Sequence, residues 1–202
     1  MSKKVILVTG SNGGIGYEFV HLLAAKGHTV YISSRNESAG KDARPVSSAK
    51  IRKEKNLEVK HVQLEVTDIR SVQAAVAKIS EDEGHLNVLV DNAGVGEIGK
   101  PVDVAGFLRE LTAYITSKTV ASSCTIALAH GLKAEGIKVN CAAPDFTSTG
   151  LNEFREGGKT TKQGAEMLVE WTLLGKDGRT GESLSKIHHC CWECGADHGS
   201  NI

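Results

Sequence analysis

Short apolar runs alternate with amphipathic segments along the first half of the chain. Residues 5–8 are continuously apolar and β-branched, which is typical of a parallel strand buried on both faces. The next segment places Phe19, Val20, Leu22 and Leu23 on one side and stops at Gly27, which predicts an amphipathic helix. Further strands are predicted at residues 28–33, 59–66, 87–90 and 137–142.

Helices are predicted between these strands. A polar stretch broken by Pro45 is expected to be helical, and a third helix opens at Thr67 and Asp68, with Asp68 as its N-cap. Its apolar positions recur at three- and four-residue spacing: Ile69, Val72, Ala75, Val76 and Ile79. Such alternation predicts a doubly wound, parallel α/β sheet whose ligand lies at the carboxyl ends of the strands.

A glycine-rich turn directly follows the first strand and opens the first helix: Thr9-Gly10-Ser11-Asn12-Gly13-Gly14-Ile15-Gly16. Glycine permits positive φ and a close approach of the backbone to a pyrophosphate, and the helix N-terminus offers free N–H donors to it. A tight turn without a ligand is the alternative. Arg35 ends the second strand, where a carboxylate would favour NAD, so we expect NADP; a solvated surface arginine is the other interpretation.

Composition narrows the class of protein. The 202 residues, of 21.5 kDa, provide for one domain. The 24 basic and 24 acidic residues cancel, which argues against nucleic-acid or acidic-membrane partners. The early apolar run is too short for a signal peptide or a membrane span, so a cytoplasmic protein is expected. The five cysteines are unevenly spaced and form no disulfide framework.

Three ordered motifs carry a resemblance. The spacing Thr-Gly-xxx-Gly-Ile-Gly, then Leu89-Val90-Asp91-Asn92-Ala93-Gly94, then Tyr114-Ile115-Thr116-Ser117-Lys118, resembles the short-chain dehydrogenase/reductase family. Residues 136–140 and 144–149 extend the likeness, which covers residues 3–181. Arg35, residues 64–68, residues 163–166 and residues 173–175 look most like the NADPH-dependent carbonyl-reductase branch. The resemblance implies a Rossmann-like fold and hydride transfer between NADPH and an aldehyde or ketone.

The resemblance also implies a set of cofactor-binding residues. The pyrophosphate would be lined by Gly10, Asn12, Gly14, Ile15 and Gly16, and the 2′-phosphate by Arg35. Glu65 and Val66 would border the adenine, Asn92, Ala93 and Gly94 would lie on the adenosine side, and Thr149 would reach the nicotinamide amide. Four positions depart from the family: Gly13 replaces a lysine that supports NADP selectivity, Glu65 an aspartate, Asp91 an asparagine and Asp145 a glycine.

Tyr114 and Lys118 are the candidate catalytic pair. Four residues apart on a helix, their side chains share one face. A tyrosine can donate a proton to a carbonyl oxygen that accepts hydride, and a neighbouring ammonium lowers its pKa from about 10 toward neutrality. In most proteins this spacing is only a surface pair. By resemblance, Lys118 would also hold the nicotinamide ribose, so that both residues contact the cofactor.

The middle of the chain is too short for the family pattern. Residues 95–113 contain no serine and no asparagine, so the family's catalytic serine and asparagine are absent. These 19 residues are also too few for the crossover helix, strand and loop that the family has between its second and third motifs. We therefore expect a sheet that lacks one helix and one central strand, one long helix over residues 103–135 or two that meet near Gly106 or Thr112, and an incomplete dimerisation surface. The strand at Ile137 would pair with the strand ending at Asp91 or leave an apolar gap.

Residues 1–181 are thus predicted to form an NAD(P)-binding domain and residues 182–202 an atypical, disordered tail that replaces a last strand. The tail contains four residues of types that bind zinc, namely His189, Cys191, Cys194 and His198. One Cys-xx-Cys pair is a weak signal for a zinc site, so no metal site is predicted. The main hypothesis is an NADP-dependent carbonyl reductase of impaired activity acting on a small-molecule carbonyl. The alternatives are a catalytically inactive NADP-binding protein and a truncated, non-functional variant.

Overall fold

Strand β1 (Val5–Val8) is buried along its whole length because parallel strands flank it on both sides. It pairs with β2 (Thr29–Ser34) and with β4 (Val88–Val90), and β3 (Val59–Gln63) extends the sheet beyond β2. The order is β3-β2-β1-β4. The computed structural model describes residues 2–35, 57, 59–94, 104–154, 156–175 and 177–184, without the side chains of residues 104–111, 113–115, 117 and 184.

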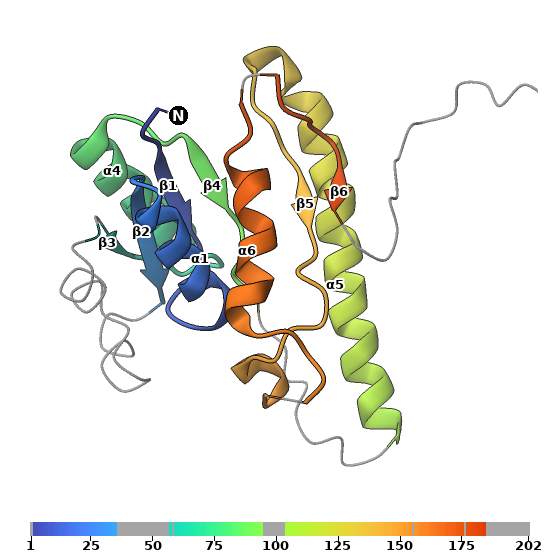
Figure 1. The fold of residues 1–202 in the computed structure, drawn as a ribbon. Helices are drawn as coiled ribbons and strands as arrows, with labels where there is room; N and C mark the ends of the chain where they lie inside the picture. The colour runs from blue at the N-terminus through green and yellow to red at the C-terminus, as the bar shows by residue number, and fades with distance from the viewer. Residues whose placement is uncertain are drawn as a thin grey trace, which may run out of the picture.

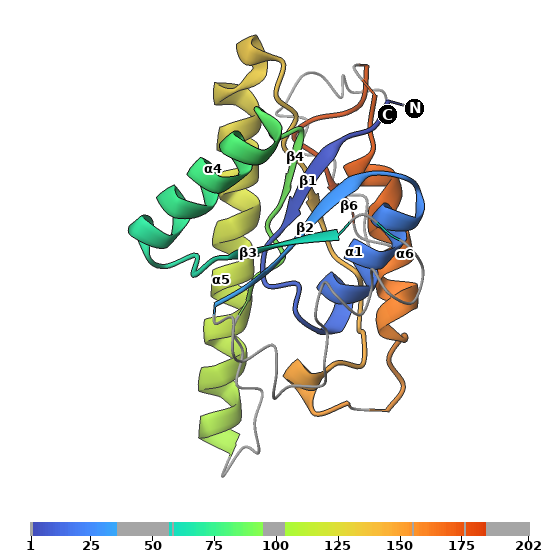
Figure 2. The same cartoon turned by 90° about the vertical axis from the view of Figure 1, so that its left-hand side faces the viewer.

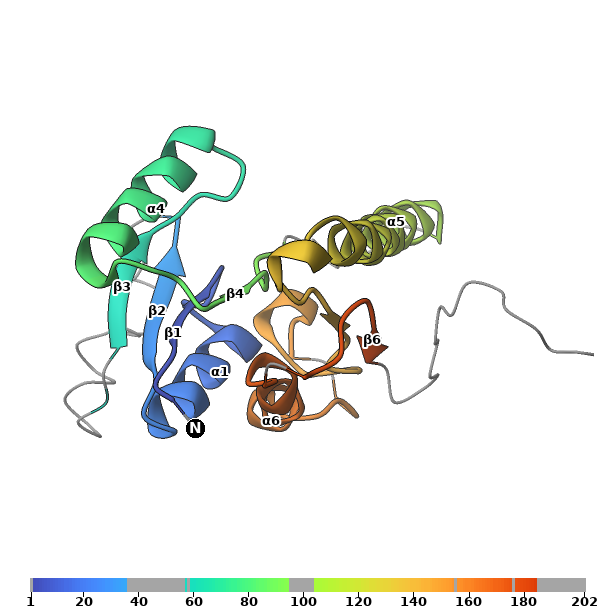
Figure 3. The same ribbon diagram turned by 90° about the horizontal axis from the view of Figure 1, so that it is seen from above.

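Helices cover both faces of this sheet (Figures 1 and 3). On one face, α1 (Gly14–Ala25) and α6 (Thr161–Thr172) lie side by side. The core between these helices and the sheet is a cluster of buried residues from both: Ile6, Val8, Phe19, Val20, Leu23, Ala24, Val30, Ile32, Val59, Ala165 and Val169. On the other face, α4 (Ile69–Glu83) packs through Ala75 and Ile79. The prediction of a doubly wound parallel sheet is therefore confirmed.

Helix α4 begins as its sequence predicts but buries only part of its apolar face. The Asp68 carboxylate accepts a hydrogen bond from the N–H of Arg70 at 2.9 Å, which confirms the N-cap. Ala75 and Ile79 are buried, whereas the side chains of Ile69 and Val76 are 67% and 59% exposed. The helix thus carries a wider apolar stripe than the described sheet covers.

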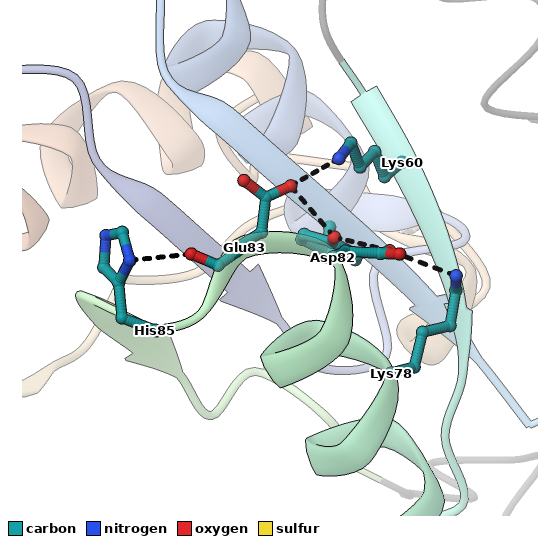
Figure 4. Close-up of polar contacts among 6 residues, drawn as sticks. Lys60, Lys78, Asp82, Glu83 and His85 are labelled. Carbon is teal, nitrogen blue, oxygen red and sulfur yellow. Dashed lines mark hydrogen bonds and ion pairs between the residues drawn. The ribbon is translucent and has the colours of Figure 1, made fainter.

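A polar cluster joins α4 to β2 and β3 (Figure 4). The fully buried Tyr31 donates its hydroxyl proton toward Asp82 Oδ2 at 2.9 Å and Glu83 Oε1 at 3.1 Å. Lys60 on β3 pairs with Glu83, and Lys78 Nζ lies 3.1 Å from Asp82 Oδ2. Burial raises the pKa of Tyr31, and its hydrogen bond lowers the pKa of Asp82. The cluster fixes the end of α4 that leads into β4.

Helix α5 (Val104–Gly131) and two short strands form a separate layer beside the main sheet. Helix α5 runs without a break, the first of the two alternatives for residues 103–135, and a 3₁₀ turn follows (η1, Lys133–Glu135). Strands β5 (Cys141–Ala142) and β6 (Ser183–Leu184) lie alongside α5 (Figures 1 and 2). They pair in parallel with each other and not with β4.

The strand near Ile137 therefore does not pair with β4. Within the described residues the main sheet ends at β4, and Leu89 on that strand is 60% exposed, which fits the expected apolar gap. Only residues 141–142 of the predicted 137–142 strand form, because β6 offers a short partner, and Ile137 is 46% exposed. The third strand ends at Gln63 rather than residue 66.

Strand β6 corrects the prediction for the end of the chain. Ser183 and Leu184, assigned to the tail, pair with Cys141 and Ala142, so a short last strand is present. Gly181, with φ at +77°, turns the chain into this strand while its N–H bonds the carbonyl of Val139 at 2.8 Å. The stretch broken by Pro45 and residues 185–202 lie outside the described part of the chain.

Candidate functional site

The turn between β1 and α1 presents open backbone at the carboxyl edge of the sheet. Gly10 and Gly14 have φ values of +57° and +59°, which an L side chain rarely adopts. A Cβ atom built at Gly13 or Gly14 would meet no atom of the described residues within 4 Å. In that part of the chain no side chain caps the N-terminus of α1, and the first turn of α1 contains no acidic residue. Its N–H groups and positive dipole end thus face a cradle suited to an anion.

Two buried serines hold this turn against the end of β2. Ser33 Oγ accepts a hydrogen bond from the N–H of Gly10 at 3.1 Å. Ser11 Oγ accepts one from the N–H of Ser33 at 3.0 Å and donates to the carbonyl of Val8 at 2.7 Å. Both serines are fully buried. Sequence reasoning assigned them no role, although short hydroxyl side chains at two adjacent strand ends are the signal for such bonding.

The end of β4 is fixed to the same turn through Thr9. The Thr9 hydroxyl oxygen accepts hydrogen bonds from the N–H groups of Asn92 and Ala93 at 3.0 and 2.9 Å, and the hydroxyl donates to Asp91 Oδ1 at 3.0 Å. The Asn92 amide donates to the carbonyls of Thr9 and Gly10 at 2.9 and 3.1 Å. Residues 91–93 are therefore built into the floor of the turn.

Two of the glycines are required by these close approaches. A Cβ at Gly16 would lie 2.5 Å from Asn92 Nδ2, so the start of α1 can pack on Asn92 only without a side chain at that position. A Cβ at Gly10 would meet Ala93 in the same way. The sequence motifs after β1 and at the end of β4 thus form one unit in space.

Arg35 lies beyond the end of β2, beside Glu65. The Arg35 side chain is 73% exposed, and its Nε lies 4.0 Å from Glu65 Oε2. Hydrogen bonds from the hydroxyl and the N–H of Thr67, at 2.8 and 3.2 Å, lower the pKa of Glu65, and the Arg35 guanidinium adds to this effect. The Arg35 head can therefore reach an anion in solvent, next to a carboxylate. Val66 is 45% exposed beside Glu65.

Helix α5 brings the catalytic candidates toward this edge. Tyr114 and Lys118 lie four residues apart in α5; the structure describes the backbone of Tyr114 but not its side chain. Lys118 Nζ lies 3.6 Å from the position of a Cβ at Gly94, so its ammonium sits beside the end of β4. The structure thus brings Gly10, Gly16, Asn92, Ala93, Gly94 and Lys118 together.

The remaining candidates have other surroundings. Asn12 and Gly14 are exposed at the turn, and Ile15 is partly buried against the core between α1 and α6. Thr149 Oγ1 accepts a hydrogen bond from the N–H of Leu151 at 3.3 Å, so this side chain caps its own short 3₁₀ turn (η2, Gly150–Asn152). Asp145, which replaces a family glycine, turns its carboxylate onto Lys159.

Neither a metal centre nor a membrane span is found in the part of the chain that the structure describes. No group of three or more His, Cys, Asp or Glu side chains there could hold a metal ion, and the candidate zinc ligands near the end lie outside that part. Among the same residues, no helix is both long and apolar enough to cross a bilayer.

Relatives in sequence match about half of the chain. A (-)-isopiperitenone reductase of Mentha piperita is 42% identical over 105 residues, 52% of this chain and 33% of the reductase. A (+)-neomenthol dehydrogenase of Capsicum annuum is 34% identical over 118 residues, 57% of this chain and 36% of the dehydrogenase. The match thus spans about a third of each of these relatives.

Solved structures share the fold at low identity. Salutaridine reductase from Papaver somniferum superposes with a TM-score of 0.73 at 19% identity over 90% of this chain and 99% of that one. An actinorhodin polyketide ketoreductase variant with NADPH gives 0.73 at 21% identity over 90% and 95%. The family model described as short chain dehydrogenase matches residues 4–107, about half of the chain. The chain therefore belongs to the short-chain dehydrogenase/reductase family of oxidoreductases, with its Rossmann-like fold.

Proposed function

We propose that this chain binds NADP(H) at the carboxyl edge of β1, β2 and β4 and passes hydride from it to a small aldehyde or ketone. The observation that carries the proposal is the glycine turn, which is hydrogen-bonded to the ends of β2 and β4 while its outer side stays open. A pyrophosphate requires both an open backbone and unpaired N–H groups at a helix N-terminus. The residues present fit that group.

The choice of NADP rests on Arg35. A guanidinium can pair with a 2′-phosphate through two parallel hydrogen bonds, whereas a carboxylate at this position would select the ribose hydroxyls of NAD. Glu65, 4.0 Å from Arg35, competes for the same cation and reduces this preference. An NADPH-bound ketoreductase among the fold neighbours is consistent with the proposal.

Tyr114 and Lys118 would supply the proton chemistry. The nicotinamide, when bound, supplies the hydride. Tyr114 donates a proton to the carbonyl oxygen as negative charge develops there. The Lys118 ammonium, whose Nζ lies 3.6 Å from a Cβ built at Gly94, would stabilise the phenolate that Tyr114 becomes when it gives up this proton. Without the family serine the oxyanion lacks one hydrogen-bond donor, which costs roughly 10²–10³ in rate.

Binding without turnover is the second candidate function. The observation that favours it is the outer edge of β4, which pairs with no strand among the described residues, so the layer that would place a further donor beside the carbonyl is missing. Residues 95–103, which follow β4, contain no serine. In this case the turn would hold the dinucleotide while no substrate oxygen is polarised strongly enough for hydride transfer.

Two measurements separate these functions. We expect NADPH fluorescence to change on titration with the protein, more strongly than NADH fluorescence; no response to either contradicts both functions. We then expect slow NADPH oxidation with a panel of aldehydes, ketones and quinones. Tyr114→Phe should lower kcat at least about 100-fold and change the Kd for NADPH much less, by under about fivefold, because it removes only one hydroxyl from the cofactor site. Tyr17→Phe removes the same hydroxyl group elsewhere and is the matched control. Binding with no turnover would establish the second function.

A further inference from the structure

The two ends of the segment between β5 and α6 lie together, which closes a loop that is described over residues 145–154 and 156–160 and is called the 145–160 loop below. Its two ends run side by side, since Thr147 and Lys159 form a parallel bridge. The N–H of Ser148 bonds the carbonyl of Lys159, and the N–H of Lys159 bonds the carbonyl of Phe146, both at 2.9 Å. The η2 turn, capped by Thr149, lies inside this loop. The base of the loop is therefore fixed by backbone pairing.

An ion pair lies at this base. The Asp145 carboxylate contacts the Lys159 ammonium, and the two side chains are only 15% and 30% exposed. Asp145 also has a φ of +58°, in the left-handed region that non-glycine residues rarely adopt. A half-buried carboxylate without a partner would be unfavourable there. Lys159 thus stabilises both the charge and the strained backbone of Asp145.

The base of the loop also contacts the glycine turn through α6. Thr147 is buried, and a Cβ built at Gly164 on α6 would lie 2.9 Å from Thr147 Oγ1 and 3.6 Å from Ile15 Cγ1. Gly164 thus lies where the loop and the first turn of α1 meet. Asp145 stands two residues before Thr147, and Thr149 stands two residues after it. The ion pair therefore lies at the base of a loop that packs beside the proposed pyrophosphate cradle.

We propose that Asp145 and Lys159 are a positioning pair that keeps the 145–160 loop closed against the start of α1 before the dinucleotide binds. This inference rests on the proposed function, in which the closed loop holds Thr149 on the nicotinamide side of the site before the cofactor arrives. Lys159 also neutralises the Asp145 carboxylate, which is only 15% exposed. Loss of Lys159 both opens the loop and releases that negative charge.

Chymotrypsin cleavage after Phe154, whose side chain is 67% exposed in the loop, measures opening without any cofactor. We expect Lys159→Met to increase the cleavage rate and to raise the Kd for NADPH about tenfold. Lys162→Met is the matched control, because Lys162 is 65% exposed and its pairing with Glu166 lies on α6, outside the loop. The control should behave as the parent protein in both assays.

Rescue separates positioning from a general loss of stability. Asp145→Gly combined with Lys159→Met removes the orphaned carboxylate and supplies a residue that adopts φ of +58° freely, so the Kd for NADPH should return to within about threefold of the parent value. An unrescued Kd overturns the proposal. Lys159→Arg, which keeps the charge, should retain slow cleavage.

Asp145→Asn guards against a Lys159 variant that fails to fold, since asparagine keeps the size and tolerates left-handed φ while losing the charge. Faster cleavage than in the parent supports the ion pair, and an unchanged rate overturns it. If the parent protein binds no NADPH, the proposed function fails, but the cleavage rates still decide whether the pair closes the loop.

Discussion

Gly10 and Ala93 contact each other through bare backbone: a Cβ at residue 10 would lie 2.8 Å from Cα of Ala93 and 3.0 Å from its Cβ. One residue belongs to the turn after β1 and the other to the segment after β4. Their contact joins the two family motifs into one floor beneath the proposed pyrophosphate. The segment after β4 can pack this closely on the turn only because residue 10 has no side chain.

Gly10→Ala should therefore disturb both stability and binding. The left-handed φ of +57° and the backbone clash together should lower the free energy of unfolding by roughly 2–4 kcal/mol, measured by urea denaturation. NADPH affinity should fall at least about tenfold because the floor of the turn moves. Gly13→Ala is the control for stability alone, because its φ is −170° and a Cβ there meets no described atom within 4 Å, although it lies in the proposed cradle. Equal losses in the free energy of unfolding for the two variants would contradict this account.

Thr9→Val tests the polar bonds of the same floor. Valine keeps the shape of threonine but leaves the N–H groups of Asn92 and Ala93 without their acceptor. We expect a loss of about 1–3 kcal/mol in the free energy of unfolding, measured by thermal or urea denaturation. The control is Thr67→Val, whose hydroxyl donates to Glu65 at an exposed site and should change stability by less than about 0.5 kcal/mol.

The sequence predicts the first half of this fold because local pattern and burial agree there. The continuous apolar run Val5–Val8 is buried throughout. Asp68 caps α4, as is expected of a short acidic side chain directly before an amphipathic repeat. Glycines in a turn indicate positive φ or a close approach of another segment, so the sequence alone singles out Gly10, Gly14 and Gly16. The partners of those glycines, Ala93 and Asn92, follow from topology once parallel strands are placed.

Other features depend on contacts that no local pattern specifies. Ser11 and Ser33 bond the turn only because β1 and β2 are adjacent in the register seen. The spacing of Ile69 and Val76 predicts burial. Both are exposed, because no described segment packs over that side of α4. Ser183 and Leu184 form a strand too short for any periodicity to reveal. The ion pair between Asp145 and Lys159 likewise could not be predicted, because the two residues meet only once the loop between them has closed.

A pair of leucines measures how open the edge of the sheet is. Leu7 on β1 is 6% exposed, whereas Leu89 on the neighbouring strand β4 is 60% exposed. Leu7→Ala should lower the free energy of unfolding by about 2–5 kcal/mol, and Leu89→Ala by less than about 1 kcal/mol, measured by urea denaturation. A large loss at Leu89 would show that another segment or molecule covers β4 in solution.

His28 should make stability depend on pH. Burial, and then the charges of Lys4 and Lys26, lower the pKa of His28 below its ordinary value of 6.5, and its Nδ1 accepts the N–H of Lys4 at 3.2 Å. The unfolded chain therefore binds a proton more readily than the folded chain. The free energy of unfolding should fall as pH drops below about 6.5 toward the lowered pKa, and this contribution should be fully present above 6.5. His28→Gln should flatten the pH dependence of the free energy of unfolding, measured by urea denaturation at pH of about 5.5 and 7.5.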